Sequence, residues 1–339
     1  MRLDGIDSNH PLGGLSVVEC GPLLPVPCTG AHLARLGASV LRIEPPGGDP
    51  ARTLYGGWLY ELYGTGKDHV ELDLRTDVGR SGLSSHVATA DVVITGQRPA
   101  SARRFGLDAD SVRELNPDVI HCAIIGFGND LSDRPGHDLT FLARSGALAE
   151  PATPSAQGQP PRRPAIPVAD LAAAAAAIES ILAAVLGRSL GHGGRTIEIP
   201  IADVAVSWMA PRLGHAVAPG LGGALDPAND IYRCSDGDYL AISALEQGFW
   251  TATTAVLGLP SEANEWNAAQ RIDRTESLGD DLAAAFALRP SGEVLESLMS
   301  AGVPVERVAT GTDVVERVGT DPAAWRRVAV PDWTHRRSP

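Results

Sequence analysis

The sequence predicts an α/β protein with a Rossmann-like large domain around a parallel sheet and a smaller α+β domain. Short β-branched runs alternate with helical stretches through the first half of the chain. The aromatic content is only 5%, whereas the chain has 37 glycines and 26 prolines, which suits tightly packed α/β units. Strands that alternate with helices indicate βαβ units and a two-sided parallel sheet. A mixed α+β domain is the alternative.

In the first half, a strand is predicted over residues 15–19, and residues 32–37 read as part of a helix. Further strands follow at similar spacing, over residues 38–43, 91–95 and 119–125. Residues 151–167 are rich in Pro, Ala, Gly and Gln and predict a loop. The Ala-rich run 171–186 then predicts a helix that begins at Asp170 and ends at Gly187.

The last third predicts the smaller domain. A Gly- and Pro-rich stretch, residues 216–227, precedes a hairpin of strands 231–234 and 239–242. Helices are predicted over residues 247–257, 279–288 and 292–301. We therefore expect a large domain over residues 1–200, to which residues 310–339 return, a linker over 201–226 and a small domain over 227–309.

The bulk composition excludes several classes of partner. The net charge of −13 argues against nucleic acid. Four scattered cysteines without a CxxC motif argue against a metal site and indicate a reducing compartment. The N-terminus has no apolar signal region, and run 171–186 is too short and too rich in alanine to span a bilayer. We expect a cytoplasmic protein without a metal or a membrane partner.

Two residues are candidates for acid–base chemistry. Asp170 starts the Ala-rich helix, where its carboxylate would meet free backbone N–H groups. An ordinary N-cap is the simpler interpretation, but helix starts at the edge of such sheets also bind ligands. His137 lies in the turn Arg134-Pro135-Gly136-His137-Asp138. It is either a surface histidine held by Asp138 or a general acid–base, since a neighbouring carboxylate lets an imidazole exchange protons near pH 7.

Five basic residues could form a phosphate-binding patch: Arg42, Lys67, Arg98, Arg103 and Arg104. Scattered solvated charges are the alternative, which the residues alone favour. The chain contains no GxSxG, P-loop or HExxH motif, so hydrolase, NTPase and metalloprotease functions lack support.

Several segments, taken in order, resemble the family III CoA-transferases, which include the α-methylacyl-CoA racemases. The longest reads Leu-Ala-Arg-Leu-Gly-Ala-Ser-Val-Leu-Arg-Ile-Glu-Pro-Pro-Gly-Gly-Asp-Pro over residues 33–50. The others are residues 12–19, 70–74, 90–94, 105–107, 115–117, 126–128, 134–139 and 232–237.

The resemblance implies roles for particular residues. The transferase branch uses one aspartate as a nucleophile on acyl-CoA, and Asp170 looks like that residue. The racemase branch pairs this aspartate with a histidine in a Gly-His-Asp motif, aided by a glutamate after a strand of the small domain. His137 and Glu246 match these positions, which favours racemase-like chemistry. The resemblance also implies an interlocked homodimer and CoA as part of the substrate, with no other cofactor and no metal.

Two departures concern the expected CoA site. The family's Ala-Gly-Pro appears here as Pro25-Val26-Pro27, and Val26 adds bulk where backbone usually approaches the ligand. The usual pair of basic residues before the Val-Glu-Leu-Asp-Leu strand is reduced to Lys67. A carrier-protein thioester is therefore an alternative substrate to acyl-CoA.

The expected mechanism is inversion at the carbon next to a thioester carbonyl. His137 and Asp170 would face opposite sides of this carbon, one removing the proton and the other returning it. Glu246 and Asp138 would orient His137, and N–H groups at the helix start would bind the enolate oxygen. The alternatives are CoA transfer with Asp170 as nucleophile, another enolate reaction such as a cyclisation or condensation, and thioester binding without turnover.

Overall fold

The computed structural model describes residues 10–148, 160–212, 226–322 and 324–325. The chain forms two compact units. The first contains residues up to 147, residues 164–208 and those from 318 onward, and the second contains residues 148–163 and 209–317.

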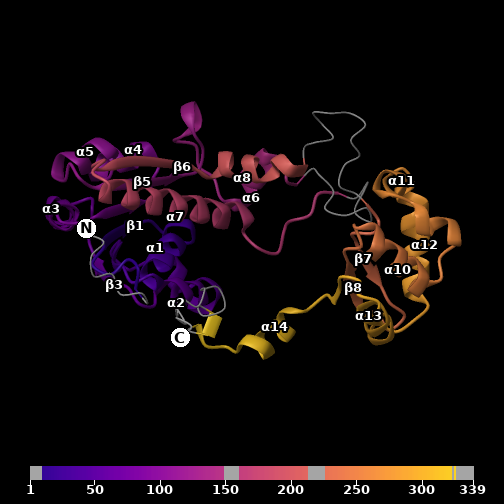
Figure 1. The fold of residues 1–339 in the computed structure, drawn as a ribbon. Coiled ribbons are helices and arrows are strands. Elements are labelled where there is room, and N and C mark those ends of the chain that lie inside the picture. Colours follow the sequence, from indigo (N-terminus) through magenta and orange to yellow (C-terminus); the bar gives the residue numbers. More distant parts are fainter. Residues whose placement is uncertain (1–9, 149–159, 213–225, 323, 326–339) are drawn as a thin grey trace, which may run out of the picture. The chain divides into compact units, whose positions relative to one another are not determined.

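The first unit is built on a parallel sheet of six strands in the order β3-β2-β1-β4-β5-β6 (Figure 1). The strands are β1 (Ser16–Cys20), β2 (Ser39–Glu44), β3 (Asp68–Glu71), β4 (Val92–Thr95), β5 (Ile120–Ile125) and β6 (Arg195–Pro200). The central strands are buried on both faces because helices cover each side; every residue of β4, for example, is buried. The predicted fold class is confirmed.

Helices pack on both faces of this sheet. Helices α1 (Pro25–Arg35) and α7 (Val168–Ser189) contact each other on one face, where α7 also contacts β5 and β6. Helices α3 (Asp77–Val87) and α5 (Ala109–Leu115) contact each other on the opposite face (Figure 1). The remaining helices of the unit are α2 (Trp58–Gly64), α4 (Pro99–Phe105), α6 (Asp138–Ser145) and α8 (Ile201–Met209).

Helix α7 is longer than predicted. It begins at Val168 instead of Asp170, and it continues through Gly187 to Ser189. Near its end, the Arg188 guanidinium pairs with Asp91 at 2.8 Å. By length and composition alone α7 could cross a membrane, contrary to the prediction. Core helices of α/β domains meet the same criteria, and α7 packs against α1, α6, β5 and β6.

The second unit combines a three-stranded antiparallel sheet with helices. Strands β7 (Ile231–Arg233) and β8 (Tyr239–Ile242) form the predicted hairpin, and β9 (Val305–Arg307) pairs with β8. The helices are α10 (Gln247–Leu257), α11 (Ala268–Ile272), α12 (Thr275–Ala287), α13 (Ser291–Ser300) and α14 (Gly311–Val318). Fully buried Trp250 and Phe286 belong to its core, and Tyr232 stacks on Phe286 with ring centroids 4.8 Å apart.

The unit boundaries differ from the predicted domains in two places. Residues 201–209, predicted as linker, form α8, which begins in the first unit. The return to the first unit begins at residue 318 instead of 310. Much of the two predicted irregular stretches, residues 151–159 and 216–225, lies outside the described residues.

Candidate functional site

The first unit contains a pocket of about 740 Å³ at the carboxyl edge of its sheet. It is lined by residues at or just after the ends of four strands: Cys20 and Gly21, Ile43 and Glu44, Gly96 and Gln97, and Ile124 and Gly126. Strands β1 and β4 are neighbours in the sheet, and the strand order reverses between them. Such a switch point is where doubly wound sheets bind ligands.

The floor of the pocket is tightly packed around Val26, which is 2% exposed. A Cβ atom on Gly21 would lie 2.7 Å from Val26 Cγ2, and one on Gly96 would lie 2.9 Å from the same atom. Glycine is therefore needed after both β1 and β4. The valine that departs from the family motif fills the space between these two strand ends.

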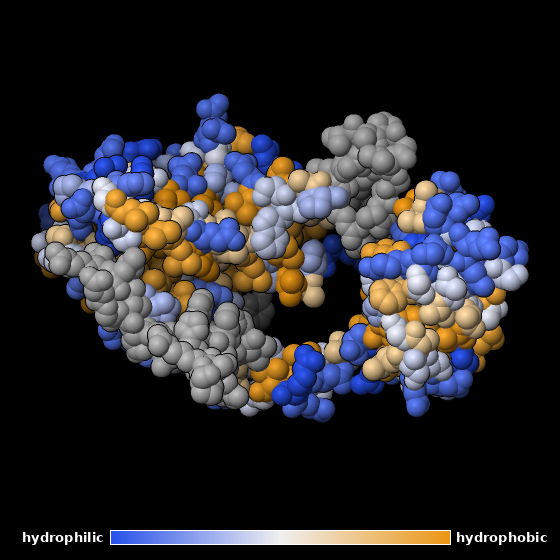
Figure 2. Space-filling view, viewed as in Figure 1, coloured by the Kyte–Doolittle hydropathy of each residue, from blue (hydrophilic) through white to orange (hydrophobic). Residues whose placement is uncertain are grey.

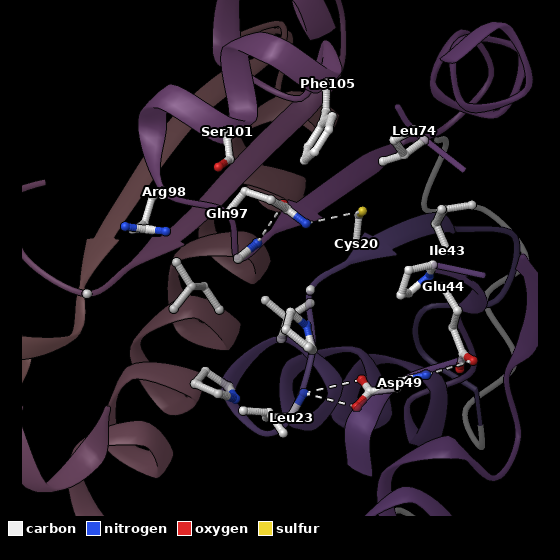
Figure 3. Close-up of a pocket in the computed structure, with 18 of the residues that line it drawn as sticks. Cys20, Leu23, Ile43, Glu44, Asp49, Leu74, Gln97, Arg98, Ser101 and Phe105 are labelled. Atoms are coloured by element: carbon white, nitrogen blue, oxygen red, sulfur yellow. Dashed lines mark hydrogen bonds between the residues drawn. The ribbon is translucent and has the colours of Figure 1, made fainter. Parts of the chain in front are cut away.

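One wall of the pocket is held by a buried carboxylate (Figure 3). Asp49 accepts the backbone N–H of Leu23 at 3.2 Å and that of Ala51 at 2.6 Å. Leu23 adopts the left-handed conformation, with φ of 67°. Because this conformation is unfavourable for leucine, the bond to Asp49 stabilises the loop that lines the pocket.

His137 lies beside the pocket at the start of α6. Its backbone N–H donates to the Thr140 hydroxyl at 3.0 Å, and this hydroxyl donates to the His137 carbonyl at 2.7 Å. These two bonds hold the backbone at the helix start. The side chain is exposed and lines the pocket.

Asp170 lines the same pocket, as the third residue of α7. It is half-buried, and burial raises the pKa of its carboxyl to about 7, with a smaller contribution from the negative charge of Asp138. Among the described residues its carboxylate has no ion-pair or hydrogen-bond partner. The structure therefore brings His137 and Asp170 to one cavity.

Asp138 has a different contact from the one predicted. Its Oδ1 accepts the backbone N–H of Ala169 at 2.8 Å and that of Asp170 at 3.2 Å. Asp138 therefore caps α7 from a neighbouring helix, whereas Asp170 was expected to be the cap. Leu171 donates to Pro167, so N–H groups of residues 169–171 are already used. The prediction that such N–H groups bind an enolate oxygen is wrong for these three residues.

Of the five predicted phosphate-binding residues, Arg98 lines the pocket and donates to the Asp133 carbonyl at 3.3 Å, whereas Arg103 lies outside the pocket lining. Arg104 is exposed and stacks on the Phe105 ring at 4.6 Å, outside the pocket lining. Figure 3 shows Arg98 and Ser101 on one side of the pocket, with Glu44 and Asp49 on the other.

The other two form internal ion pairs. Arg42 is 2% exposed and contacts the carboxylates of Glu19, Glu44 and Asp49. Lys67 donates to both carboxylate oxygens of Glu19, at 2.8 and 2.7 Å. Neither lines the pocket. The prediction that they bind phosphate is not supported by their positions, because buried carboxylates already compensate their charges.

Two arginines of the pocket were missed. Arg75 lines it and pairs with Asp73 at 2.8 and 2.9 Å. Arg134 also lines it, with its guanidinium 5.1 Å from the Phe127 ring centroid. Two features of the sequence could have indicated these residues. Arg134 lies in the same turn as His137, and Arg75 lies just after an edge strand.

Glu246 belongs to the second unit, where it is exposed and precedes α10. Its carbonyl accepts the N–H of Trp250 at 2.9 Å. The described lining of the pocket contains residues of the first unit alone, so Glu246 is not among them, and its predicted role beside His137 stays a prediction.

The chemistry available in this pocket is that of a carboxyl and an imidazole. Burial raises the pKa of the Cys20 thiol to about 12, so this lining residue is protonated and a poor nucleophile at neutral pH. A carboxyl with a pKa of about 7 is ionised in part at neutral pH. It can then attack an acyl carbonyl or exchange a proton with a bound molecule. No group of three or more His, Cys, Asp or Glu residues in the described ranges could hold a metal ion.

The chain is similar to known proteins in both sequence and fold. The model of CoA-transferase family III matches residues 12–335. The succinyl-CoA–D-citramalate CoA-transferase of Chloroflexus aurantiacus is 29% identical, covering 90% of this chain and 80% of its own. The human α-methylacyl-CoA racemase is 29% identical over 74% of this chain and 66% of its own. A crystal structure of a CAIB/BAIF family protein from Brucella suis has a TM-score of 0.77 at 26% identity, covering 94% of this chain and 88% of that one. The chain belongs to CoA-transferase family III.

Proposed function

We propose that this protein transfers CoA between carboxylic acids and that Asp170 is its nucleophile. The observation that carries the proposal is a half-buried carboxyl that lines the pocket and has no cation or hydrogen-bond donor beside it among the described residues. The similarity to a CoA-transferase over 90% of the chain supports the same reaction.

The reaction needs only the carboxylate and the two substrates. The Asp170 carboxylate attacks the thioester carbonyl, the C–S bond breaks, and CoA leaves as a thiolate, which gives an anhydride between Asp170 and the acyl group. The thiolate then attacks the Asp170 carbonyl carbon, which releases the first acid and leaves CoA on Asp170. The acceptor carboxylate reverses these two steps and departs as the new thioester.

A second candidate function is racemisation, and the position of His137 on the same pocket favours it. His137 and Asp170 would remove and return the α-proton of an acyl thioester, with Glu246 as a helper from the second unit. Similarity to a racemase supports this candidate over a smaller share of the chain. Other enolate reactions would begin with the same proton transfer.

One experiment separates the two functions. The protein is incubated in deuterated water with an acyl-CoA that carries an α-proton, with and without an acceptor acid. Transfer predicts a new CoA thioester only when the acceptor is present, without deuterium at the α-carbon. Racemisation predicts deuterium incorporation without an acceptor.

Variants then assign the residues. Under transfer, Asp170→Asn lowers the rate by a factor on the order of 10⁴ or more, as expected for loss of a nucleophile. His137→Gln retains it within about tenfold, because the imidazole then serves only as a modest proton donor or contact. Glu179→Gln, an exposed residue of α7 outside the pocket lining, is the matched control. Deuterium incorporation that both pocket variants abolish would establish racemisation instead.

We also propose that the protein is a homodimer. Several large hydrophobic side chains are exposed on or near α7 and α8: Ile166, Leu186, Leu190, Val206 and Trp208. Figure 2 shows hydrophobic surface gathered over α7 on the visible face of the first unit. Exposed apolar surface of this kind is typical of protein interfaces. Light scattering during size-exclusion chromatography tests this, and a monomeric mass would refute it.

A further inference from the structure

Three arginines line the pocket, and they differ in their partners. Arg75 forms a two-bond contact with the Asp73 carboxylate. Arg98 donates to the Asp133 carbonyl, outside the turn that carries His137. Neither Arg98 nor Arg134 has a carboxylate within ion-pair distance among the described residues, but Arg98 donates to a backbone carbonyl. Arg134 lies in the same turn as His137, so it is the pocket arginine that we consider for a ligand near the reacting carbonyl.

The backbone of Arg134 is held in place by its surroundings. Its N–H donates to the Leu131 carbonyl at 2.8 Å. The turn that follows rests on two aromatic rings, Phe127 and Phe141, which meet edge to face with centroids 5.1 Å apart. A Cβ atom on Gly136 would lie 2.4 Å from Phe141 Cε1, so only glycine allows this approach. The turn therefore has a defined position on the wall of the pocket.

The guanidinium of Arg134 is held as well, because it stacks over the Phe127 ring. Stacking on an aromatic face leaves the edge of the guanidinium, with its N–H groups, available for hydrogen bonds. This edge matches a carboxylate with two parallel bonds. The net charge of −13 repels anions in general, so binding an anionic acyl group requires a local cation of this kind.

We propose that Arg134 binds a free carboxylate of the acyl group, and that the substrates are CoA thioesters of dicarboxylic acids. This inference rests on the proposed function, because it assigns specificity to the same pocket. Arg134 is three residues from His137, in the same turn. A second carboxylate of a short diacid lies only a few bonds from the thioester carbonyl. The phosphates of CoA, in contrast, are separated from that carbonyl by the whole pantetheine arm.

The test compares two thioesters of nearly equal size, succinyl-CoA and butyryl-CoA, which differ by a terminal carboxylate in place of a methyl group. Wild-type protein is expected to favour succinyl-CoA in kcat/KM by about ten- to a hundredfold, the range of a charge-assisted hydrogen-bond pair. Arg134→Gln should lose most of this preference by slowing succinyl-CoA alone, and Arg134→Lys should be intermediate. Arg144→Gln, an exposed arginine of α6 outside the pocket lining, should behave as wild type.

Binding measurements keep the inference separate from the proposed function. Calorimetry with succinyl-CoA, butyryl-CoA and CoA alone should show that Arg134→Gln weakens only succinyl-CoA, whether or not turnover occurs. Equal losses for all three ligands would mean that Arg134 binds CoA itself or maintains the fold, and the inference fails. Absence of transfer with a retained succinyl-CoA preference would overturn the proposed reaction alone.

Discussion

Two regions at the carboxyl edge of one sheet differ in whether their charged side chains have oppositely charged partners. Around β2, buried Arg42 and Lys67 are each paired with carboxylates that are also buried. At the start of α7, Asp170 is half-buried with another carboxyl, Asp138, contributing to its raised pKa. Paired charges hold the wall of the pocket, whereas the unpaired carboxyl is available to react. Whether a charge has an oppositely charged partner therefore distinguishes structural residues from reactive ones here better than residue type does.

The largest effect is expected when one member of a buried ion pair is removed. Lys67→Met leaves the Glu19 carboxylate buried without its ammonium, and we expect the free energy of unfolding to fall by about 3–5 kcal/mol. Asp170→Asn should not lower it, because it removes a like charge next to Asp138. Urea unfolding of both variants measures the difference. A stable Lys67→Met protein with lost CoA binding would show instead that Lys67 contacts the ligand.

A smaller effect is expected at the floor of the pocket. Gly96→Ala places a methyl group against Val26, and we expect a loss of about 1–3 kcal/mol in the free energy of unfolding from overpacking. The additional change Val26→Ala should restore part of this loss, because it removes the opposing methyl groups. Thermal and urea denaturation of the single and double variants check the coupling. If the effects of the two single changes on the free energy of unfolding simply add in the double variant, the proposed contact between residues 96 and 26 is contradicted.

The smallest effect concerns pH. Only ionised Asp170 attacks a thioester, and its pKa is about 7, so the transfer rate should rise with pH through that value. Asp138→Asn removes the negative charge that contributes to this raised pKa, so the midpoint of the rise should move to lower pH. The asparagine oxygen can still accept the two N–H bonds of α7. A pH–rate profile of wild type and variant tests this, and a midpoint that stays in place would exclude Asp138 as a cause.

Local sequence predicted much of the fold but less of the site. The β-branched runs predicted four of the six strands of the large sheet, β1, β2, β4 and β5. The helix predicted over residues 247–257 is also present, as α10. The edge strand β6 was missed, and α7 was started two residues late. Its cap, Asp138, lies more than thirty residues earlier in the chain. The partners of Arg42 and Lys67 are also distant in the sequence. The sequence alone therefore could not show which charged residues are buried in ion pairs and which are exposed.

The anchoring of α7 has a consequence for how this chain tolerates insertions and deletions. One end of the helix is bonded to Asp138, and near the other end Arg188 pairs with Asp91. A helix turns by about 100° per residue, since one turn takes about 3.6 residues. Adding or deleting a single residue between Asp170 and Arg188 would rotate one anchor away from its partner or swing the carboxyl out of the cavity. The number of residues between them is therefore a fixed spacing, whatever their identity.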